Sequence, residues 1–249
     1  MPVTLERILA DAPVRSIEEA LVIMNAIDDA LPDSDGVKWF NRLYLRVTVA
    51  VGAAVRDARF NDAAFLATLD VVFANLYFTA LAAGLADVDA APAAWRPVLH
   101  ARHDQRIARI QFALAGMNAH INRDLPDGIV QSFLALGGDP LTDTLREQDF
   151  ESVNGILEQV EQDVRAEFAV GLAGVVDRLG GDVDNAVAMW KLRAARSTAW
   201  TNAQVLWGLR GVPRLRDRFF ARLDGLVGLT GQGLLVPREA IVRHVSSKA

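Results

Sequence analysis

The chain has 249 residues, 51% of them hydrophobic, a formal net charge of -5 at pH 7 and no cysteine. This length and hydrophobic content predict a single domain over residues 1–249 that can bury a sizeable core. The lack of cysteine excludes disulfides, thiolate metal sites and a cysteine nucleophile. The acidic balance argues against nucleic-acid binding, which needs a basic face.

Two segments bear on targeting and membranes. Glu6, Arg7 and Asp11 lie where a secretory signal needs an uninterrupted apolar stretch. The longest uncharged run, 71–86, is shorter than the roughly 20 residues of a membrane span, and Asn75 interrupts it. We therefore expect an unprocessed cytoplasmic protein, monomeric or homodimeric, with no membrane partner.

Apolar residues recur at three- and four-residue spacing along the chain, without sustained alternation, which predicts an all-α bundle of about eight to ten helices. Ser16 followed by Glu19 resembles a capping box that begins a helix ending near Ala30. Further helices are expected over 37–59, 62–86 and 104–122, with Pro97 interrupting a short one between them and another short one starting at Asp127.

The C-terminal half is punctuated by glycine and proline. Leu125 precedes Pro126 and should leave the helical region, so the helix before it is expected to end there. Long helices are expected over 149–178 and 182–210, separated by Gly180 and Gly181 and followed by two shorter helices. The glycine-spaced stretch 225–233 is expected to be a loop.

The segment Gln111 to Pro126 is the part of the chain richest in candidate chemistry. His120 and Asp124 are four residues apart and share a helical face if the last turn holds. Ala113 and Gly116 lie on the same stripe, and their small side chains leave room for a ligand or for a tightly packed helix.

A second polar stripe lies on the opposite side of the same helix. Gln111, Asn118 and Asn122 follow each other at spacings of seven and four. A buried amide without a partner costs on the order of 1 to 3 kcal/mol, so this stripe needs an explanation beyond filling the core. We take Asn118 and Asn122 as candidate ligand-binding residues.

Three interpretations of His120 and Asp124 stay open. As metal ligands they supply an imidazole and a carboxylate to a divalent ion, with Asp70, Asp35 or Asn118 completing the set. As an acid–base pair, Asp124 orients His120 and raises its basicity. As a structural pair, they cap the carbonyls of their own helix end.

Polar side chains on other helices are candidates to meet His120. Asn41, Tyr44 and Thr48 share one stripe, and Asp70, Ala74 and Tyr77 share another. A buried Asp70 needs a cation or donors, and Arg196, on a helix that also carries Trp200, is the expected bidentate partner. We take Asp70 and Arg196 as candidate catalytic residues and Tyr44, Tyr77 and Trp200 as candidate ligand-binding residues.

These residues also carry a family resemblance. The stretches Phe40-Asn-Arg-Leu-Tyr44, Phe73-Ala-Asn-Leu-Tyr-Phe78 and Asn118-Ala-His-Ile-Asn-Arg-Asp-Leu125, with the later Ala195-Arg196 and Ala199-Trp200, resemble an all-helical bacterial family of unknown function, of actinobacterial type. The resemblance covers most of the chain and implies an all-helical fold. It locates a site at the Asn-x-His-Ile-Asn-x-Asp-Leu pattern without implying a reaction.

The sequence therefore favours a helical-bundle enzyme with a pocket lined by His120 and Asp124. We expect a small apolar or weakly polar substrate and hydrolysis or a proton-transfer rearrangement of the cyclase type, with a divalent metal as an open alternative. The competing interpretation is a non-catalytic ligand-binding or interaction protein in which these residues form a structural hydrogen-bond network.

Overall fold

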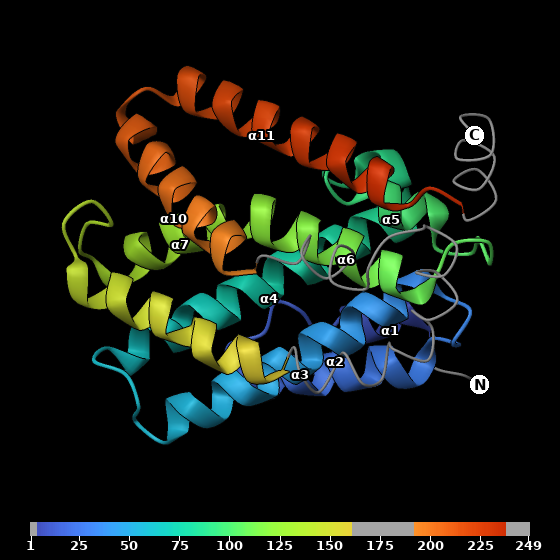
Figure 1. Ribbon diagram of the computed structural model, residues 1–249, viewed down its shortest axis with the longest axis horizontal. Coiled ribbons are helices and arrows are strands. Elements are labelled where there is room, and N and C mark those ends of the chain that lie inside the picture. Colours follow the sequence, from blue (N-terminus) through green and yellow to red (C-terminus); the bar gives the residue numbers. More distant parts are fainter. Residues whose placement is uncertain (1–3, 161–191, 238–249) are drawn as a thin grey trace, which may run out of the picture.

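The structure is a computed structural model, and it describes residues 4–160 and 192–237. These residues form an all-α bundle without strands, as the sequence predicts (Figure 1). The first helices are α1 (Leu5–Leu9), α2 (Ile17–Ala30), α3 (Gly36–Arg56), α4 (Ala63–Ala86) and α5 (Arg96–Ala101). Then come α6 (Arg109–Ala119), α7 (Leu125–Leu136), a helix over 144–160, α10 (Leu192–Gly208) and α11 (Pro213–Leu234).

Side-chain caps fix where the first long helices begin. Ser16 accepts a hydrogen bond from the backbone N–H of Glu19, while the Glu19 carboxylate accepts from the N–H of Arg15, one residue before the cap. Asp35 and Asp62 cap α3 and α4 by accepting from the N–H groups of Val37 and Phe65. Each cap satisfies an N–H that the helix itself leaves unpaired.

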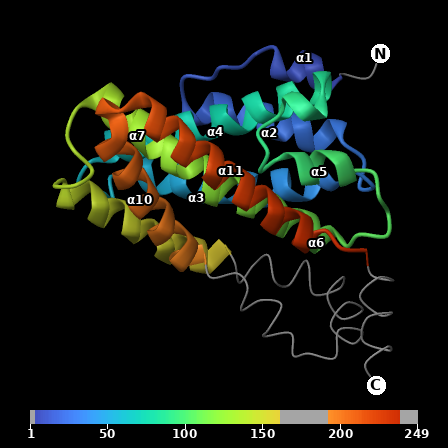
Figure 2. The same ribbon diagram turned by 90° about the horizontal axis from the view of Figure 1, so that it is seen from above.

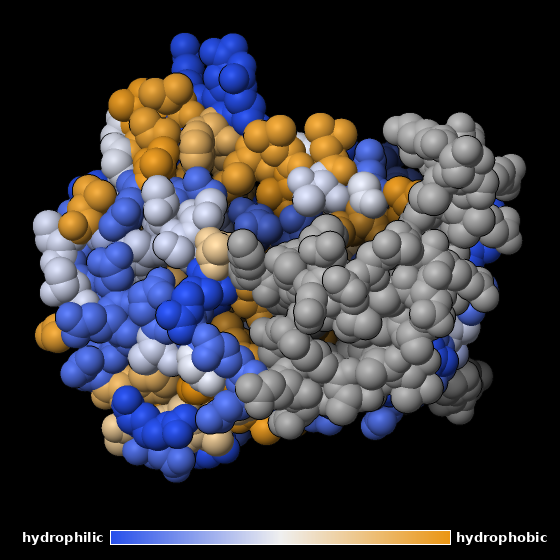
Figure 3. All heavy atoms as spheres, viewed as in Figure 1, coloured by the Kyte–Doolittle hydropathy of each residue, from blue (hydrophilic) through white to orange (hydrophobic). Residues whose placement is uncertain are grey.

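The helices pack so that α6 and α7 run through the centre of the bundle. α3 and α11 contact α6, whereas α4 and α10 contact α7 (Figures 1 and 2). α2 covers the other side of α3. α11 forms an outer edge of the molecule, and hydrophobic side chains gather along that edge (Figure 3).

Two predicted boundaries are wrong for local reasons. Pro97 does not interrupt α5 but lies in its first turn, where its missing N–H costs nothing. α6 begins at Arg109 rather than Asp104, because the Asp104 carboxylate binds the backbone and guanidinium of Arg106 in a turn.

The stretch 225–233 is part of the continuous helix α11, not a loop. A Cβ at Gly228 would lie 2.5 Å from the carbonyl oxygen of Ala93, so the glycine allows α11 to approach this backbone closely. The sequence shows the glycines but not the neighbour that requires one of them.

The predicted helix end before Pro126 is also wrong. The chain passes from α6 into α7 through a π-helical turn, His120–Asp124, in which the N–H of Leu125 donates to the carbonyl of His120. Leu125 keeps helical dihedral angles, with φ -62° and ψ -42°. The wider turn accommodates the proline, whose ring would otherwise clash with the carbonyl four residues earlier. The candidate residues therefore lie inside a helix and not at its end.

α4 contains the apolar run noted in the sequence. Within the described part of the chain it is the one helix with the length and composition of a membrane span, and half of its most apolar window is buried within the fold. Its buried face includes Phe65, Asp70, Phe73 and Tyr77. α4 thus places two of the candidate residues, Asp70 and Tyr77, in the core.

Two predicted helices extend outside the described residues. The helix expected over 149–178 begins earlier, at residue 144, and is described to residue 160. The one expected over 182–210 is described as α10, Leu192–Gly208. Gly180, Gly181 and the predicted helix start at Asp182 lie outside the described residues.

Candidate functional site

His120 and Asp124 form the centre of the site, as their spacing predicted. Nδ1 of His120 lies 3.0 Å from Oδ2 of Asp124, and both side chains are almost completely buried. Asp124 also accepts from the indole N–H of Trp95, at 2.9 Å, and from the guanidinium of Arg123, at 2.7 Å. Three donors therefore hold this carboxylate in place.

The carboxylate determines which nitrogen of His120 carries the proton. An ionised carboxylate only accepts hydrogen bonds, so Nδ1 of the imidazole is the donor. Burial lowers the pKa of His120 below its ordinary value of 6.5, although the hydrogen bond and charge of Asp124 partly oppose the shift. The imidazole is then neutral near pH 7, and Nε2 carries a lone pair.

Among residues 4–160 and 192–237, that lone pair has no hydrogen-bond partner. A buried Nε2 without a partner costs free energy unless a ligand or a water molecule uses it. Buried polar atoms in native proteins are nearly always paired. An imidazole fixed at Nδ1 and free at Nε2 has the geometry of a general base.

Aromatic rings surround the imidazole. Phe73 stacks parallel to it with ring centroids 3.4 Å apart, and Tyr44 meets it edge-on at 4.4 Å. Phe40, Trp95 and Tyr77 lie at 5.5, 5.9 and 6.1 Å between centroids. The imidazole thus lies in an apolar environment, in which electrostatic interactions are stronger than in water.

Three further buried polar groups lie close to this cage. Within the described residues, Oδ2 of Asp70 has no hydrogen-bond partner, and the hydroxyls of Tyr44 and Thr48, one turn apart on α3, have no partner other than each other. Burial raises the pKa of Asp70 to about 7, and burial together with the nearby Asp70 carboxyl raises the pKa of Tyr44. Asp70 lies one helical turn before Phe73, the ring stacked on His120.

Arg123 connects the dyad to α11. Besides its hydrogen bond to Asp124, it forms an ion pair with Asp224, 3.5 Å from Nε, and lies 4.8 Å from the centroid of the Phe220 ring. Asp224 in turn accepts from the backbone N–H groups of Ala93 and Ala94, next to Trp95. Asp224 of α11 therefore supports both residues that donate to Asp124 from outside the dyad: Arg123 through the ion pair, and Trp95 through the backbone just before it.

The second polar stripe of α6 forms hydrogen bonds with α11 and the residues just after it rather than with the dyad. Gln111 donates to the carbonyls of Leu234 and Val236, at the end of α11. Asn118 donates to the carbonyl of Val227, and Asn122 donates to Asn118. The predicted ligand-binding amides Asn118 and Asn122 are thus paired within the fold.

The predicted ion pair between Asp70 and Arg196 does not form. Arg196 donates to the side chain of Asn154 and to the carbonyl of Phe150, and its guanidinium lies 4.0 Å from the Phe150 ring centroid. Trp200 packs against Phe150 as well, at 4.9 Å between ring centroids. Arg196 and Trp200 belong to the packing of α10 on the 144–160 helix, because that helix supplies the acceptors of Arg196 and the Phe150 ring that both residues contact.

The small residues Ala113 and Gly116 do not leave the room for a ligand that the sequence suggested beside His120. A Cβ on Gly116 would lie 2.4 Å from the ring of Phe40, so the stripe of Ala113 and Gly116 is filled by the tight crossing of α3 over α6. Of the two uses that the sequence left open, a tightly packed partner helix is the one observed.

Tyr77 lies in the cage, but its hydroxyl points to another group. It donates to the side chain of Asn41 at 3.4 Å, and Asn41 donates to the carbonyl of Met24. Burial raises the pKa of Tyr77. Tyr77 therefore contributes its ring rather than its hydroxyl to the surroundings of His120.

Two of the three residues considered as further metal ligands, Asp35 and Asn118, are paired with other groups. Asp35 forms a bidentate pair with Arg102, at 2.6 Å, and the Asn118 amide is used by Val227 and Asn122. Over residues 4–160 and 192–237, no group of three or more His, Asp or Glu side chains could hold a metal ion. Around Nε2 of His120 the described residues therefore supply the His120–Asp124 pair and no further set of metal ligands.

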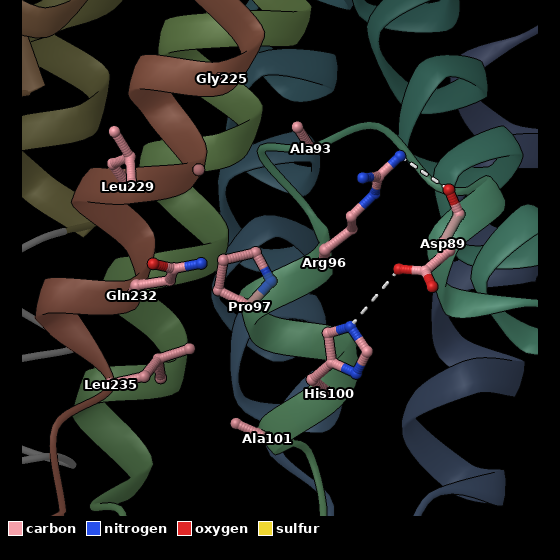
Figure 4. Close-up of a pocket in the computed structure, with 11 residues that line it drawn as sticks. Asp89, Ala93, Arg96, Pro97, His100, Ala101, Gly225, Leu229, Gln232 and Leu235 are labelled. Atoms are coloured by element: carbon pink, nitrogen blue, oxygen red, sulfur yellow. Dashed lines mark hydrogen bonds and ion pairs between the residues drawn. The ribbon is translucent and has the colours of Figure 1, made fainter.

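A separate groove of about 490 Å³ lies between α5 and α11 (Figure 4). Its polar side chains pair with one another, since Arg96 donates to the carbonyl of Asp89 and His100 lies 3.9 Å from the Asp89 carboxylate. Its other wall includes Leu229, Gln232 and Leu235 of α11. His120 does not line it.

Sequence reasoning missed Trp95, Arg123 and the stacked Phe73. Trp95 lies 29 residues from Asp124 in the chain, and no local pattern links the two. Phe73 has the same periodicity as any core residue of α4. Only the crossing of the helices shows that these side chains meet.

The chain belongs to a family of unknown function (DUF5995), whose sequence profile matches residues 17–237. No curated protein and no solved structure matches it. The resemblance noted in the sequence is thus confirmed at the level of a family of unknown function, and the matched range includes His120, Asp124 and the aromatic cage.

Proposed function

We propose that the protein is an enzyme that moves a proton on a small, weakly polar molecule, with Nε2 of His120 as the general base. The observation that carries the proposal is the unpaired Nε2 of an imidazole whose other nitrogen is held by Asp124. A positioned base of this kind contributes typically 10²–10⁴-fold to a rate. The reaction is a hydrolysis, with water as the proton donor, or a rearrangement that begins with proton removal.

Asp70 supplies a second titrating group. Its pKa of about 7 leaves a large protonated fraction at neutral pH, so it can return a proton as a general acid. The hydroxyls of Tyr44 and Thr48, which among the described residues have no partner other than each other, can bind an oxygen of the substrate. The aromatic walls select a molecule with mostly apolar surface.

The substrate approaches from the Asp70 side of α4. His120 is 0% exposed, whereas Asp70 and Phe73 are 8% and 9% exposed. Rotation of the Phe73 side chain uncovers the face of the imidazole, which makes Phe73 the gate of the site. This motion is of the kind that loops and side chains make during substrate binding.

The test compares wild type with His120→Gln and with the control Asp127→Asn, whose carboxylate binds Gln131 instead of the dyad. Purified protein, assayed for bound zinc, manganese and iron beforehand, is given p-nitrophenyl acetate and butyrate. In parallel, deuterium uptake next to the carbonyl of phenylacetone is followed by NMR in D2O. We expect turnover in one assay, reduced roughly 100-fold or more in His120→Gln and unchanged in Asp127→Asn. Equal turnover in a folded His120→Gln protein contradicts the proposal.

A second candidate is a binding protein without turnover, in which the dyad is structural. It is favoured by the saturation of Asp124, which accepts from His120, Trp95 and Arg123. In that case His120→Gln lowers stability strongly and no substrate is turned over. Thermal unfolding of the same variants separates the two candidates.

A further inference from the structure

The exposed side of α11 carries a row of arginines. Arg214, Arg218 and Arg222 follow each other at a spacing of four, so they lie on one face of the helix, and all three are exposed. We call these three arginines the basic stripe. None of them forms a hydrogen bond or ion pair with the described residues. The protein as a whole has a net charge of -5, so the stripe is a local reversal of its charge.

A row of apolar side chains runs beside the basic stripe. Val212, Leu215, Leu226 and Leu229 are 53%, 50%, 63% and 64% exposed, and the partly buried Phe219 lies between them. Their spacings of three, four and seven place them along one side of the helix. We call these five residues the apolar stripe, and Figure 3 shows hydrophobic surface along this edge. Exposed apolar surface of this extent marks an interaction site.

A second copy of the chain is a poor partner for this surface. In an antiparallel pairing of two α11 helices, Arg218 and Arg222 of both copies gather at the centre. Asp217 is the one exposed acidic residue of α11 that can offset them, since Asp224 is paired within the fold. In a parallel pairing each arginine lies beside its own counterpart. Like charges placed together cost several kcal/mol in recognition. Nucleic acid would leave the apolar stripe exposed to water.

An anionic lipid surface matches both stripes at once. Helices that lie in the membrane interface combine Leu and Phe on one side with Arg or Lys beside them, and the cations pair with lipid phosphates. Leu229 also lines the groove between α5 and α11, so the apolar surface continues inward and gives an acyl chain room beside Pro97 and Leu235.

We propose that α11 is a docking surface for anionic phospholipid membranes, with the apolar stripe at the acyl boundary and the basic stripe on the headgroups. This departs from the expectation of no membrane partner, which rested on the lack of a long enough span. A helix that lies on the surface needs no span. The inference is independent of the chemistry of His120.

The test is co-sedimentation of the full chain with vesicles of phosphatidylcholine alone or with one quarter phosphatidylglycerol. We expect binding to the anionic vesicles, weakened by salt at about 0.5 M, and little binding to the neutral ones. Arg214→Ser/Arg218→Ser/Arg222→Ser should lower the affinity roughly tenfold or more. The matched control Arg7→Ser/Arg15→Ser/Arg59→Ser removes three exposed arginines outside α11 and should bind as wild type.

Leu226→Ser/Leu229→Ser should also weaken vesicle binding while keeping its salt dependence, since the arginines remain. Circular dichroism confirms that each variant folds. Equal binding to neutral and anionic vesicles, no binding at all, or equal loss in the matched control overturns the proposal. Retention on a poly-glutamate column without vesicle binding overturns it in favour of an acidic protein partner, and dimerisation through α11 without vesicle binding overturns it in favour of a second copy.

Discussion

The rings of His120 and Phe73 lie parallel, with centroids 3.4 Å apart and an interplanar angle of 6°. Phe73 therefore covers one face of the imidazole and keeps water from it. Because desolvation is the main cause of the lowered His120 pKa, the stacked ring contributes directly to the state of the base. Phe73 thus influences the protonation of His120 although it has no polar atom.

The first prediction concerns this ring. Phe73→Leu should raise the pKa of His120 toward its ordinary value of 6.5, because water reaches the uncovered imidazole face. The pKa is measured by NMR titration of the histidine Cε1–H. Phe78→Leu, a buried phenylalanine on the same helix, is the control and should leave the titration unchanged. An equal shift in both variants would show that the effect is not due to stacking.

The second prediction concerns Asp124. Asp124→Asn should lower the pKa of His120 further, because the carboxylate is the group whose hydrogen bond and charge raise it. Stability should fall by roughly 1–3 kcal/mol, because the partly buried Arg123 keeps only its longer ion pair with Asp224. Urea unfolding and the same NMR titration measure the two effects, with Asp127→Asn as control. An unchanged His120 pKa would mean that Asp124 does not interact with the ring in solution.

The third prediction follows from the raised pKa of Asp70. A carboxyl whose pKa is higher in the folded state binds protons more tightly there, so its contribution destabilises the fold as pH rises from 3.8 to about 7. The full shift corresponds to roughly 4 kcal/mol as an upper bound. Asp70→Asn should therefore raise the free energy of unfolding at pH 8 and change it little at pH 4. Chemical denaturation at both pH values tests this, and an equal effect at both would refute it.

The fourth prediction concerns the helix crossing behind the site. Gly116→Ala places a Cβ 2.4 Å from the Phe40 ring and should destabilise the protein by roughly 1–3 kcal/mol, despite the better helix propensity of alanine. Gly155→Ala is the matched control, because nothing lies within 4 Å of its Cβ, and it should stabilise by roughly 0.4–1 kcal/mol. Thermal unfolding of the two variants gives the comparison, and the same sign for both would exclude a steric cause.

The fifth prediction concerns the anchor of α11. Gln111→Ala removes the amide that donates to the carbonyls of Leu234 and Val236, so the last turn of α11 should open more often. Hydrogen–deuterium exchange should become faster in this turn while the turns of α4 keep their rates. If exchange in α11 is unchanged, the amide does not hold the helix end.

The helical fold and its early boundaries could be predicted because their causes are local. Ser16 and Asp62 bind N–H groups three residues further along the chain, and such caps can be read directly from the residue order. The pairing of His120 with Asp124 was predictable for the same reason, since a spacing of four brings side chains together on a helix.

The rest of the site depends on contacts between distant segments. Asp70 was expected to pair with Arg196, but the bundle places Arg196 against Asn154 and leaves Oδ2 of Asp70 buried without a partner among the described residues. Pro126 was expected to end a helix, because the sequence does not show that one turn widens to admit it. Both errors come from applying pairwise rules where tertiary packing decides.

The π-helical turn has one more consequence, for the register of the chain. A turn that holds one extra residue sets α7 back by about a quarter of a rotation relative to a uniform α-helix. Deletion of one residue between His120 and Asp124 would therefore do more than shorten the segment. It would rotate Ile129 and Phe133, both fully buried, away from the interior or else turn the imidazole out of its cage. Because of the π-helical turn, α6 and α7 form one continuous helix and yet both direct their apolar side chains into the same core.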